Sequence, residues 1–174
     1  IDFDVFMPLD QSDCRDRLGL SREKIYILFP YDPSRPRKNY REVEQAASIL
    51  RQESGLPVEI LVVNGKPNEL LPFYMNAADV LVLASFWEGS PNSIKEAMAC
   101  NLRIVATDVG DIKELIGNRP GCAICEPVAR DIADKLLAVL KGPSNSTGRD
   151  SIAHLEISRI ADRVIELYRV VSRK

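Results

Sequence analysis

The stretch DVLVLASFWEGSPNSIKEAMA, residues 79–99, decides the fold. Val80 to Ala84 is apolar at every position, a pattern typical of a strand that is buried on both faces of a sheet. Farther along, Ile94, Ala97 and Met98 recur at the spacing that places them on one face of a helix. A buried strand that leads through a short loop into an amphipathic helix is the repeating unit of a parallel α/β sheet.

The same alternation extends outward over most of the chain. Short apolar runs predict strands at 25–29, 58–63, 80–84, 103–106 and 122–125. Helical spacing predicts helices at 39–53, 68–77, 91–99, 111–116, 130–141 and 151–171. We therefore predict an α/β fold, a doubly wound, Rossmann-like parallel sheet with helices on both faces and right-handed crossovers. In such sheets ligands bind at the carboxyl ends of the strands, which here lead into loops 30–39, 64–68, 85–91 and 107–111.

The second half of the chain adds three local predictions. Asp111 and Glu114 have the spacing of a capping box at the start of helix 111–116. Residues 142–148 contain Gly, Pro, Ser and Asn and predict a flexible link. The last helix carries a broad apolar stripe, which we expect to pack in the core; packing against another domain is the alternative. The stripe consists of Ile152, Leu155, Ile160, Val164, Leu167 and Val171.

Length and composition fit one globular domain, residues 1–174, with a net charge of −2 and 45% hydrophobic residues. Overall charge therefore favours neither nucleic acid nor a membrane surface, and no run approaches the ~18 apolar residues of a membrane span. Because the chain opens at Ile1 and not at Met, we expect a piece of a longer protein, with 1–20 as an entry segment and 149–172 as a C-terminal helix. We predict a cytoplasmic location, with peripheral attachment at the inner membrane face left open.

Two short motifs could suggest a metal, and we predict none. Cys122 and Cys125 have metal-ligand spacing, but no second pair exists and the single histidine, His154, is distant in sequence. Reduced thiols are the expected state of these residues. Asp2 and Asp4 form a D-x-D tripeptide, which lies outside every predicted strand-end loop.

The helix start within the opening stretch is suited to binding an anion. Ser90 is a good N-cap and Pro91 a good first helical residue, while Gly89 lets a backbone or ligand approach closely. Free amides there, at the positive end of the helix dipole, favour a phosphate. Glu88 precedes this start and Glu96 lies on the helix face away from the core, where each carboxylate can accept hydrogen bonds from sugar hydroxyls. A nucleotide sugar satisfies all three features, although a solvated surface role is the ordinary alternative for either glutamate alone.

A basic loop follows the first predicted strand. Residues 32–39 read DPSRPRKN and place three cations, Arg35, Arg37 and Lys38, at the strand's carboxyl end. Arginine pairs with phosphate oxygens in a fork, and lysine adds a compact charge. A solvated turn with a basic helix entry is the alternative for this loop.

Together these residues carry a family resemblance. Glu88 and Glu96, with seven residues between them and AMAC after them, resemble the E-x7-E motif of the GT-B glycosyltransferases of family four. The likeness covers nearly the whole chain and is most specific over 79–116. Outside the motif it is carried by residues 1–8, 33–39, 76–83 and 103–116.

The resemblance implies the C-terminal, donor-binding domain of a retaining transferase whose N-terminal domain binds the acceptor. Catalytic roles would fall to Glu88 at the donor sugar hydroxyls, and to Arg35 and Lys38, which would hold the diphosphate and stabilise it as the leaving group. Glu96 would bind the ribose hydroxyls. Other donor contacts would come from Gly89, Ser90, Asn92 and Ser93. Gly65 and Lys66 would lie near the nucleobase. The resemblance implies no metal and no cofactor.

The chain departs from the family pattern at three places. Tyr31, with the two residues before it, stands where Gly-Arg is common, which leaves Arg35 as the candidate phosphate arginine. Asn101 replaces a common Gly, and Asn tolerates the left-handed helix cap expected there. Asp111 replaces a second Gly after Gly110, in a turn that a ligand would approach.

The leading hypothesis is therefore the nucleotide-sugar-binding domain of a hexosyltransferase-type glycosyltransferase, inactive when isolated from its acceptor domain. Its product would be a surface or extracellular polysaccharide. One alternative is a non-catalytic nucleotide-binding or assembly module with the same fold, and another is a GT-B sugar-nucleotide epimerase.

Overall fold

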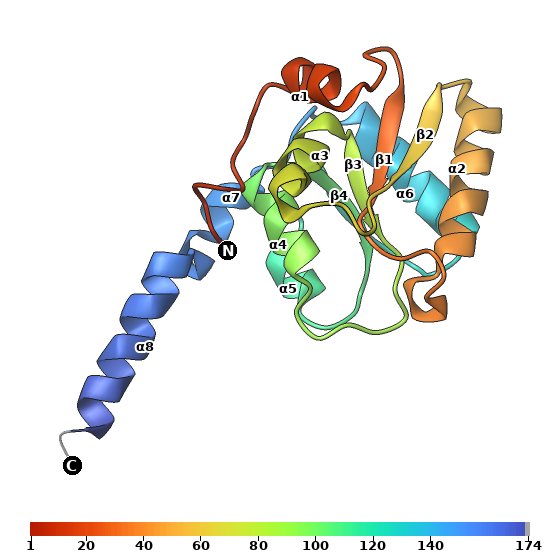
Figure 1. Ribbon diagram of the computed structural model, residues 1–174. Helices are drawn as coiled ribbons and strands as arrows, with labels where there is room; N and C mark the ends of the chain where they lie inside the picture. The colour runs from red at the N-terminus through yellow and green to blue at the C-terminus, as the bar shows by residue number, and fades with distance from the viewer. Residues whose placement is uncertain (173–174) are drawn as a thin grey trace.

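The computed structural model describes residues 1–172 and contains a five-stranded sheet whose paired strands are all parallel (Figure 1). The strands lie in the order β2-β1-β3-β4-β5. Their bounds are β1 Ile25–Phe29, β2 Val58–Val62, β3 Val80–Leu83, β4 Arg103–Thr107 and β5 Cys122–Cys125. Each of the five predicted strands is confirmed, with ends that shift by one residue at most.

Helices cover both faces of this sheet, as the sequence predicts (Figure 1). Helices α2 (Tyr40–Ser54) and α6 (Ala129–Lys141) pack together on one face. The other face carries α3 (Leu71–Ala77), α4 (Asn92–Ala99) and α5 (Ile112–Ile116). Helix α1 (Gln11–Leu18), which the sequence analysis left within an entry segment, packs against α3. Single turns of 3-10 helix occur at Pro36–Lys38, Asn68–Leu70 and Ala153–Leu155.

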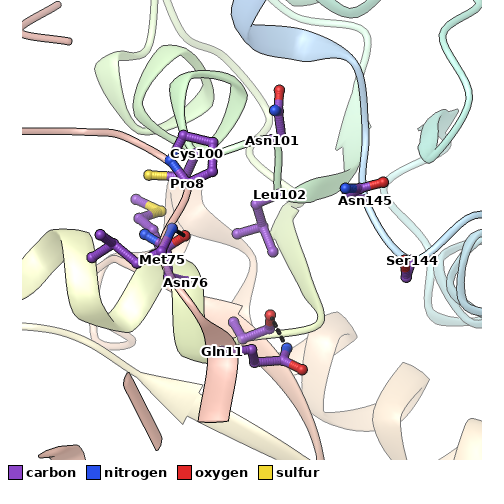
Figure 2. Close-up of a pocket in the computed structure, with 11 residues that line it drawn as sticks. Pro8, Gln11, Met75, Asn76, Cys100, Asn101, Leu102, Ser144 and Asn145 are labelled. Atoms are coloured by element: carbon purple, nitrogen blue, oxygen red, sulfur yellow. Dashed lines mark hydrogen bonds between the residues drawn. The ribbon is translucent and has the colours of Figure 1, made fainter. Parts of the chain in front are cut away.

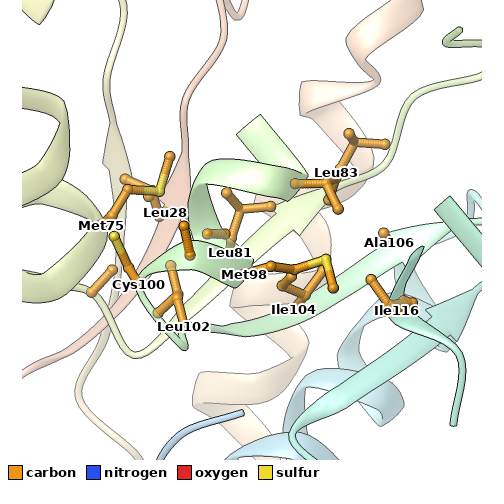
Figure 3. Close-up of a cluster of buried hydrophobic side chains, with 14 of the residues drawn as sticks. Leu28, Met75, Leu81, Leu83, Met98, Cys100, Leu102, Ile104, Ala106 and Ile116 are labelled. Atoms are coloured by element: carbon orange, nitrogen blue, oxygen red, sulfur yellow. The ribbon is translucent and has the colours of Figure 1, made fainter. Parts of the chain in front are cut away.

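Two apolar cores lie on the two faces of the sheet. Leu28, Leu81 and Leu83 point into the core beneath α3 and α4, which Figure 3 shows around Met98. Their neighbours along the strands, such as Ile27 and Val82, point to the core beneath α2 and α6. Because both faces are buried, the strands lack polar alternation, and each buried Leu or Ile contributes about 1.5–3 kcal/mol.

The strand order has one reversal point, between β1 and β3. The chain passes from β1 to β2 in one direction across the sheet and then from β3 to β4 and β5 in the other. At such a switch point the loops that follow two neighbouring strands diverge and leave a crevice beyond their carboxyl ends. The crevice is therefore expected between the loop after β1 and the loop after β3.

A cavity of about 230 Å³ lies at the opposite end of the sheet, near the amino ends of β3 and β4 (Figure 2). Two of its polar side chains, Asn76 and Gln11, are hydrogen-bonded to the protein itself. The Asn76 amide donates to the carbonyl of Met7 at 3.0 Å and accepts from the amide of Leu9 at 2.8 Å. The Gln11 amide donates to the carbonyl of Ala78 at 2.9 Å. These bonds fasten the N-terminal segment to α3 and make the cavity part of the scaffold.

The C-terminal region differs from its prediction. A single helix over 151–171 is wrong, because the chain forms α7 (Gly148–Ser151), a 3-10 turn and α8 (Ile157–Val171). Glu156 is extended and its carboxylate accepts from the amides of Ser158 and Arg159, which starts α8 as a separate helix. In Figure 1 α8 projects away from the sheet.

The predicted core packing of the C-terminal stripe is wrong for most of its members. Ile152 is buried and Leu155 is partly buried. By contrast, Ile160, Val164, Leu167 and Val171 are 37–70% exposed. Packing of this stripe against another domain remains the alternative. None of the helices described within residues 1–172 is long and apolar enough to cross a membrane.

The predicted flexible link, residues 142–148, is partly fixed by the core. Ser146 is buried, and its amide donates to the carbonyl of Asn101 at 2.8 Å. Asn101 has a φ of 55°, which confirms the left-handed conformation expected there. Arg149 then donates to the carbonyls of Phe3 and Phe6, so the N-terminal segment and α7 hold each other.

Candidate functional site

Three strand-end loops are joined by backbone hydrogen bonds at the switch point. The amide of Phe86, after β3, donates to the carbonyl of Arg37, after β1, at 3.0 Å. The amide of Asp111, after β4, donates to the carbonyl of Gly89 at 3.2 Å. Three of the four predicted strand-end loops, 30–39, 85–91 and 107–111, therefore share one region.

Lys38 and Glu88 form the charged centre of this region. The Lys38 ammonium lies 2.5 Å from one oxygen of the Glu88 carboxylate, and the Arg37 guanidinium lies 3.4 Å from the other. The side chains of Lys38 and Glu88 are only 7% and 10% exposed, while that of Arg37 is 34% exposed. The 3-10 turn at Pro36–Lys38 directs both cations toward the loop after β3.

Burial and pairing shift the ionisation of these groups in defined directions. Burial opposes ionisation of Glu88, but the hydrogen bond and charge of Lys38 outweigh it, so the pKa of Glu88 lies below its ordinary value. Burial lowers the pKa of Lys38, and the Glu88 carboxylate opposes this effect. When both are charged, the pair is neutral overall and Arg37 adds a positive charge, which favours an anionic ligand.

Tyr31 links this pair to helix α4. Its ring lies against Lys38, with the ammonium 3.7 Å from the ring centroid. Its hydroxyl is hydrogen-bonded to the hydroxyl of Ser93 in the first turn of α4. Burial raises the pKa of the Tyr31 phenol far above its ordinary range, and the charges of Glu88 and Glu96 raise it further.

Glu96 lies in α4, three residues after Ser93. Its side chain is partly exposed and makes no hydrogen bond to any other residue between 1 and 172. Burial raises the pKa of Glu96 above its ordinary value. The charge that acts on Glu96 is that of the N-terminal ammonium, which opposes the effect of burial.

Neither predicted side-chain cap forms, although Asp111 does occupy the N-cap position of α5. Pro91 and not Ser90 occupies the N-cap of α4, and no side chain of residues 1–172 caps this helix start. The Ser90 hydroxyl is hydrogen-bonded to Asp111 and to the ammonium of Lys95. Asp111 is thereby drawn across to the loop after β3, so its side chain does not cap α5. The amides of Asn92 and Ser93 in the first turn of α4 consequently have no side-chain partner within the described residues.

The other predicted site residues lie at the margin. The Arg35 side chain is 61% exposed and lies 3.7 Å from Asp32, outside the charged centre. Gly65 and Lys66 are exposed after β2, the neighbour of β1, and no ion pair joins Lys66 to the rest of residues 1–172. Arg37, and not Arg35, is the arginine that lies against Glu88. With three cations in four residues, the sequence held no signal to choose between them.

The structure gives no metal-binding arrangement to the cysteines or to the D-x-D tripeptide within the described residues. No group of three or more metal-ligating side chains occurs in the part of the chain that the structure describes. Burial raises the pKa of Cys122 to about 11 and that of Cys125 to about 12, so both are protonated thiols at neutral pH. The Asp2 carboxylate accepts from the amides of Asp4 and Val5 and holds a local turn.

These observations define the class of the chain, a Rossmann-like α/β domain with a cluster of two cations and one carboxylate at its topological switch point. The sequence model of the family described as glycosyl transferases group 1 matches residues 35–142, more than half of the chain. The chain belongs to this family, and its fold is that of a GT-B glycosyltransferase domain.

Individual relatives agree with this assignment. The putative teichuronic acid biosynthesis glycosyltransferase TuaC of Bacillus subtilis (strain 168) is 34% identical over 76 residues, which are 43% of this chain and 20% of TuaC. Sucrose-phosphate synthase (tll1590) from Thermosynechococcus elongatus has a TM-score of 0.77 and 22% identity, over 99% of this chain and 51% of that one.

Anabaena Alr3699/HepE was solved in complex with UDP and with UDP-glucose. These structures have TM-scores of 0.73 and 0.72 and 17% identity, over 98% of this chain and 56% of theirs. At such identities the solved structures show a shared fold. The chain spans about half the length of these solved chains and a fifth of TuaC.

Proposed function

We propose that this chain is the donor-binding domain of a retaining glycosyltransferase and binds a nucleoside diphosphate sugar in the switch-point crevice. The observation that carries the proposal is the cluster of Arg37, Lys38 and Glu88, which Tyr31 joins to the uncapped start of α4. An N-terminal acceptor domain would complete the enzyme, so the isolated domain is proposed to be inactive.

Each group in the crevice matches one part of such a donor. Arg37 and Lys38, with the amides of Asn92 and Ser93, would bind the diphosphate and stabilise the charge that develops on it as the sugar departs. Glu88 and Glu96 would accept hydrogen bonds from sugar and ribose hydroxyls. Arg35 would join the diphosphate only by leaving Asp32.

The relatives suggest the kind of donor and product. The UDP and UDP-glucose complexes of HepE support a uridine nucleotide and a hexosyl donor. The likeness to a putative teichuronic acid biosynthesis glycosyltransferase supports the proposed role in surface polysaccharide synthesis. We further propose that the chain acts in the cytoplasm, at the inner membrane face. Donor binding is proposed to need no metal, since the phosphate charge would be met by arginine and lysine.

Nucleotide titration tests this proposal. We expect UDP, added to the labelled chain, to shift the backbone amide signals of residues 35–38 and 88–96 in NMR spectra, more strongly than GDP or ADP does. Arg37→Ala should raise the Kd about thirtyfold, because it removes a charged hydrogen bond, and Glu96→Ala about tenfold. The proposal fails if none of the three nucleotides shifts these signals.

Two further variants make the titration specific. Lys24 pairs with Glu59 at the amino end of β1, so Lys24→Ala should leave the Kd unchanged within about twofold. Arg35→Ala compares the two candidate arginines. A Kd rise that matches that of Arg37→Ala would mean that Arg35 leaves Asp32 to bind phosphate, and a smaller rise would leave Arg37 as the main phosphate arginine.

A further inference from the structure

Tyr31 makes more contacts in the crevice than the proposed function uses. It stands two residues after β1, and its ring meets that of Phe29 edge-on, with centroids 5.3 Å apart and planes at 84°. Its ring face holds the Lys38 ammonium and its hydroxyl holds Ser93. One side chain therefore contacts the sheet, the basic loop and the first turn of α4.

These contacts limit where the Lys38 ammonium can lie. Lysine carries its ammonium on a flexible four-carbon stem, so the ammonium ordinarily occupies many positions. Here one side of the ammonium meets Glu88 at 2.5 Å and another meets the electron-rich ring of Tyr31 at 3.7 Å. The remaining donor direction is consequently fixed by the carboxylate and the ring together.

The hydroxyl of Tyr31 fixes the second element. Ser93 is the second residue of α4, and the helix start carries amides with no side-chain cap in the described residues. The bond from Tyr31 to Ser93 ties this turn to the residue that holds Lys38. The affinity for an anion that binds both the helix start and Lys38 would depend on the distance between them. Tyr31 contacts both Lys38 and Ser93 and so sets this distance.

We propose that Tyr31 is a positioning residue, which holds the Lys38 ammonium and the start of α4 at the separation that one diphosphate bridges. This inference rests on the proposed function, because it assumes a nucleoside diphosphate ligand. The aromatic ring acts through Lys38 and the hydroxyl acts through Ser93, so the two parts can be removed separately.

Two substitutions separate these parts. Tyr31→Phe keeps the ring and loses the hydroxyl, whereas Tyr31→Leu loses both. With UDP as the probe in calorimetric titration, we expect Tyr31→Leu to raise the Kd about tenfold, as befits the loss of a partly buried cation–π contact. Tyr31→Phe should raise it no more than about threefold, and this partial rescue assigns most of the effect to the ring.

A double-mutant cycle distinguishes positioning from a general structural role. If the ring of Tyr31 acts through Lys38, then Tyr31→Leu in a Lys38→Met background should raise the Kd by no more than about threefold, which is the share left to the hydroxyl. Full tenfold losses that multiply in the double variant would show that the two residues act independently, and would overturn the inference. An NMR spectrum of each variant verifies the fold, and Tyr31→Met replaces Tyr31→Leu, under the same limits, if the latter does not fold.

The outcomes for the two proposals differ. If the wild-type chain binds UDP and Tyr31→Leu binds it within twofold of the wild type, the positioning role is overturned while the proposed function stands. If the wild-type chain binds neither UDP, GDP nor ADP, the proposed function fails and the positioning role fails with it.

Discussion

Lys38→Met is expected to lower the free energy of unfolding by about 3 kcal/mol at pH 7. Lys38 and Glu88 are nearly buried, at 7% and 10% exposure of their side chains. Removal of the ammonium leaves a buried carboxylate without its closest partner, and breaking a buried pair in this way costs about 3–5 kcal/mol. Arg37, at 3.4 Å from the same carboxylate, offsets part of this cost and places the expected value at the lower end.

The loss should depend on pH in a defined direction. Burial raises the pKa of Glu88, but Lys38 outweighs burial and the net pKa lies below the ordinary 4.5. The pair therefore stabilises the fold above about pH 4.5, and this contribution disappears as the pH falls through the lowered pKa. The carboxyl can be protonated in the variant, so the difference between variant and wild type should shrink at about pH 4.

Urea unfolding at the two pH values measures this effect, and the chain contains a matched control. Lys24 pairs with Glu59 at 2.6 Å, but both side chains are 47% exposed. Lys24→Met should therefore cost less than about 1 kcal/mol at either pH. Equal losses for Lys38→Met at both pH values would mean that lost packing, and not the uncompensated charge, is the cause.

The buried parts of the fold follow directly from the sequence. A run such as Val80 to Ala84, apolar at every position, has few alternatives to a strand covered on both faces, and all five predicted strands are present. The strand order was not given by any local pattern. The order depends on how the crossovers pack, which no single segment encodes. It places β1 beside β3 and thereby sets the switch point.

The candidate site was predictable as a region but not in every contact. Lys38, Glu88 and Glu96 were expected near one another, and the structure pairs Lys38 with Glu88 and lays Lys38 against Tyr31. The pairing of Arg37 with Glu88, while Arg35 lies beside Asp32, follows the 3-10 turn at Pro36–Lys38, which the sequence Arg-Pro-Arg-Lys does not reveal. Tyr31 was noted only as a departure from the family pattern, although its ring and hydroxyl join the two halves of the crevice.

The C-terminal apolar stripe shows that helical spacing predicts a helix but not the surface against which it packs. Its helical spacing was real, since α8 forms over Ile157–Val171, but spacing does not say which surface an apolar face meets. Within the described residues α8 buries none of its side chains. The prediction of core packing failed because an amphipathic pattern is equally compatible with a partner outside the segment that carries it.

Gly110→Ala is expected to disrupt the crevice more than any other single methyl group. Gly110 has a φ of +60°, which Ala adopts at a cost of about 1–2 kcal/mol. In addition, its new Cβ would lie 1.9 Å from the carbonyl oxygen of Gly89 and 2.9 Å from that of Glu88. Both obstacles are backbone atoms, so the loop that carries Glu88 must move. We expect a loss of about 3 kcal/mol or more in the free energy of unfolding.

Gly89→Ala is the matched comparison, because a Cβ at Gly89 would meet no atom of the chain within 4 Å. The sequence analysis expected a backbone or a ligand to approach Gly89 closely. In the structure, Gly110 is the glycine that another backbone segment approaches, since the carbonyl of Gly89 lies against it. Urea unfolding should therefore leave Gly89→Ala within about 1 kcal/mol of the wild type. UDP titration should show weakened binding for Gly110→Ala, whose displaced loop carries Glu88. A Gly110→Ala chain with wild-type stability and wild-type UDP affinity would show that the loop after β3 is not held by this turn.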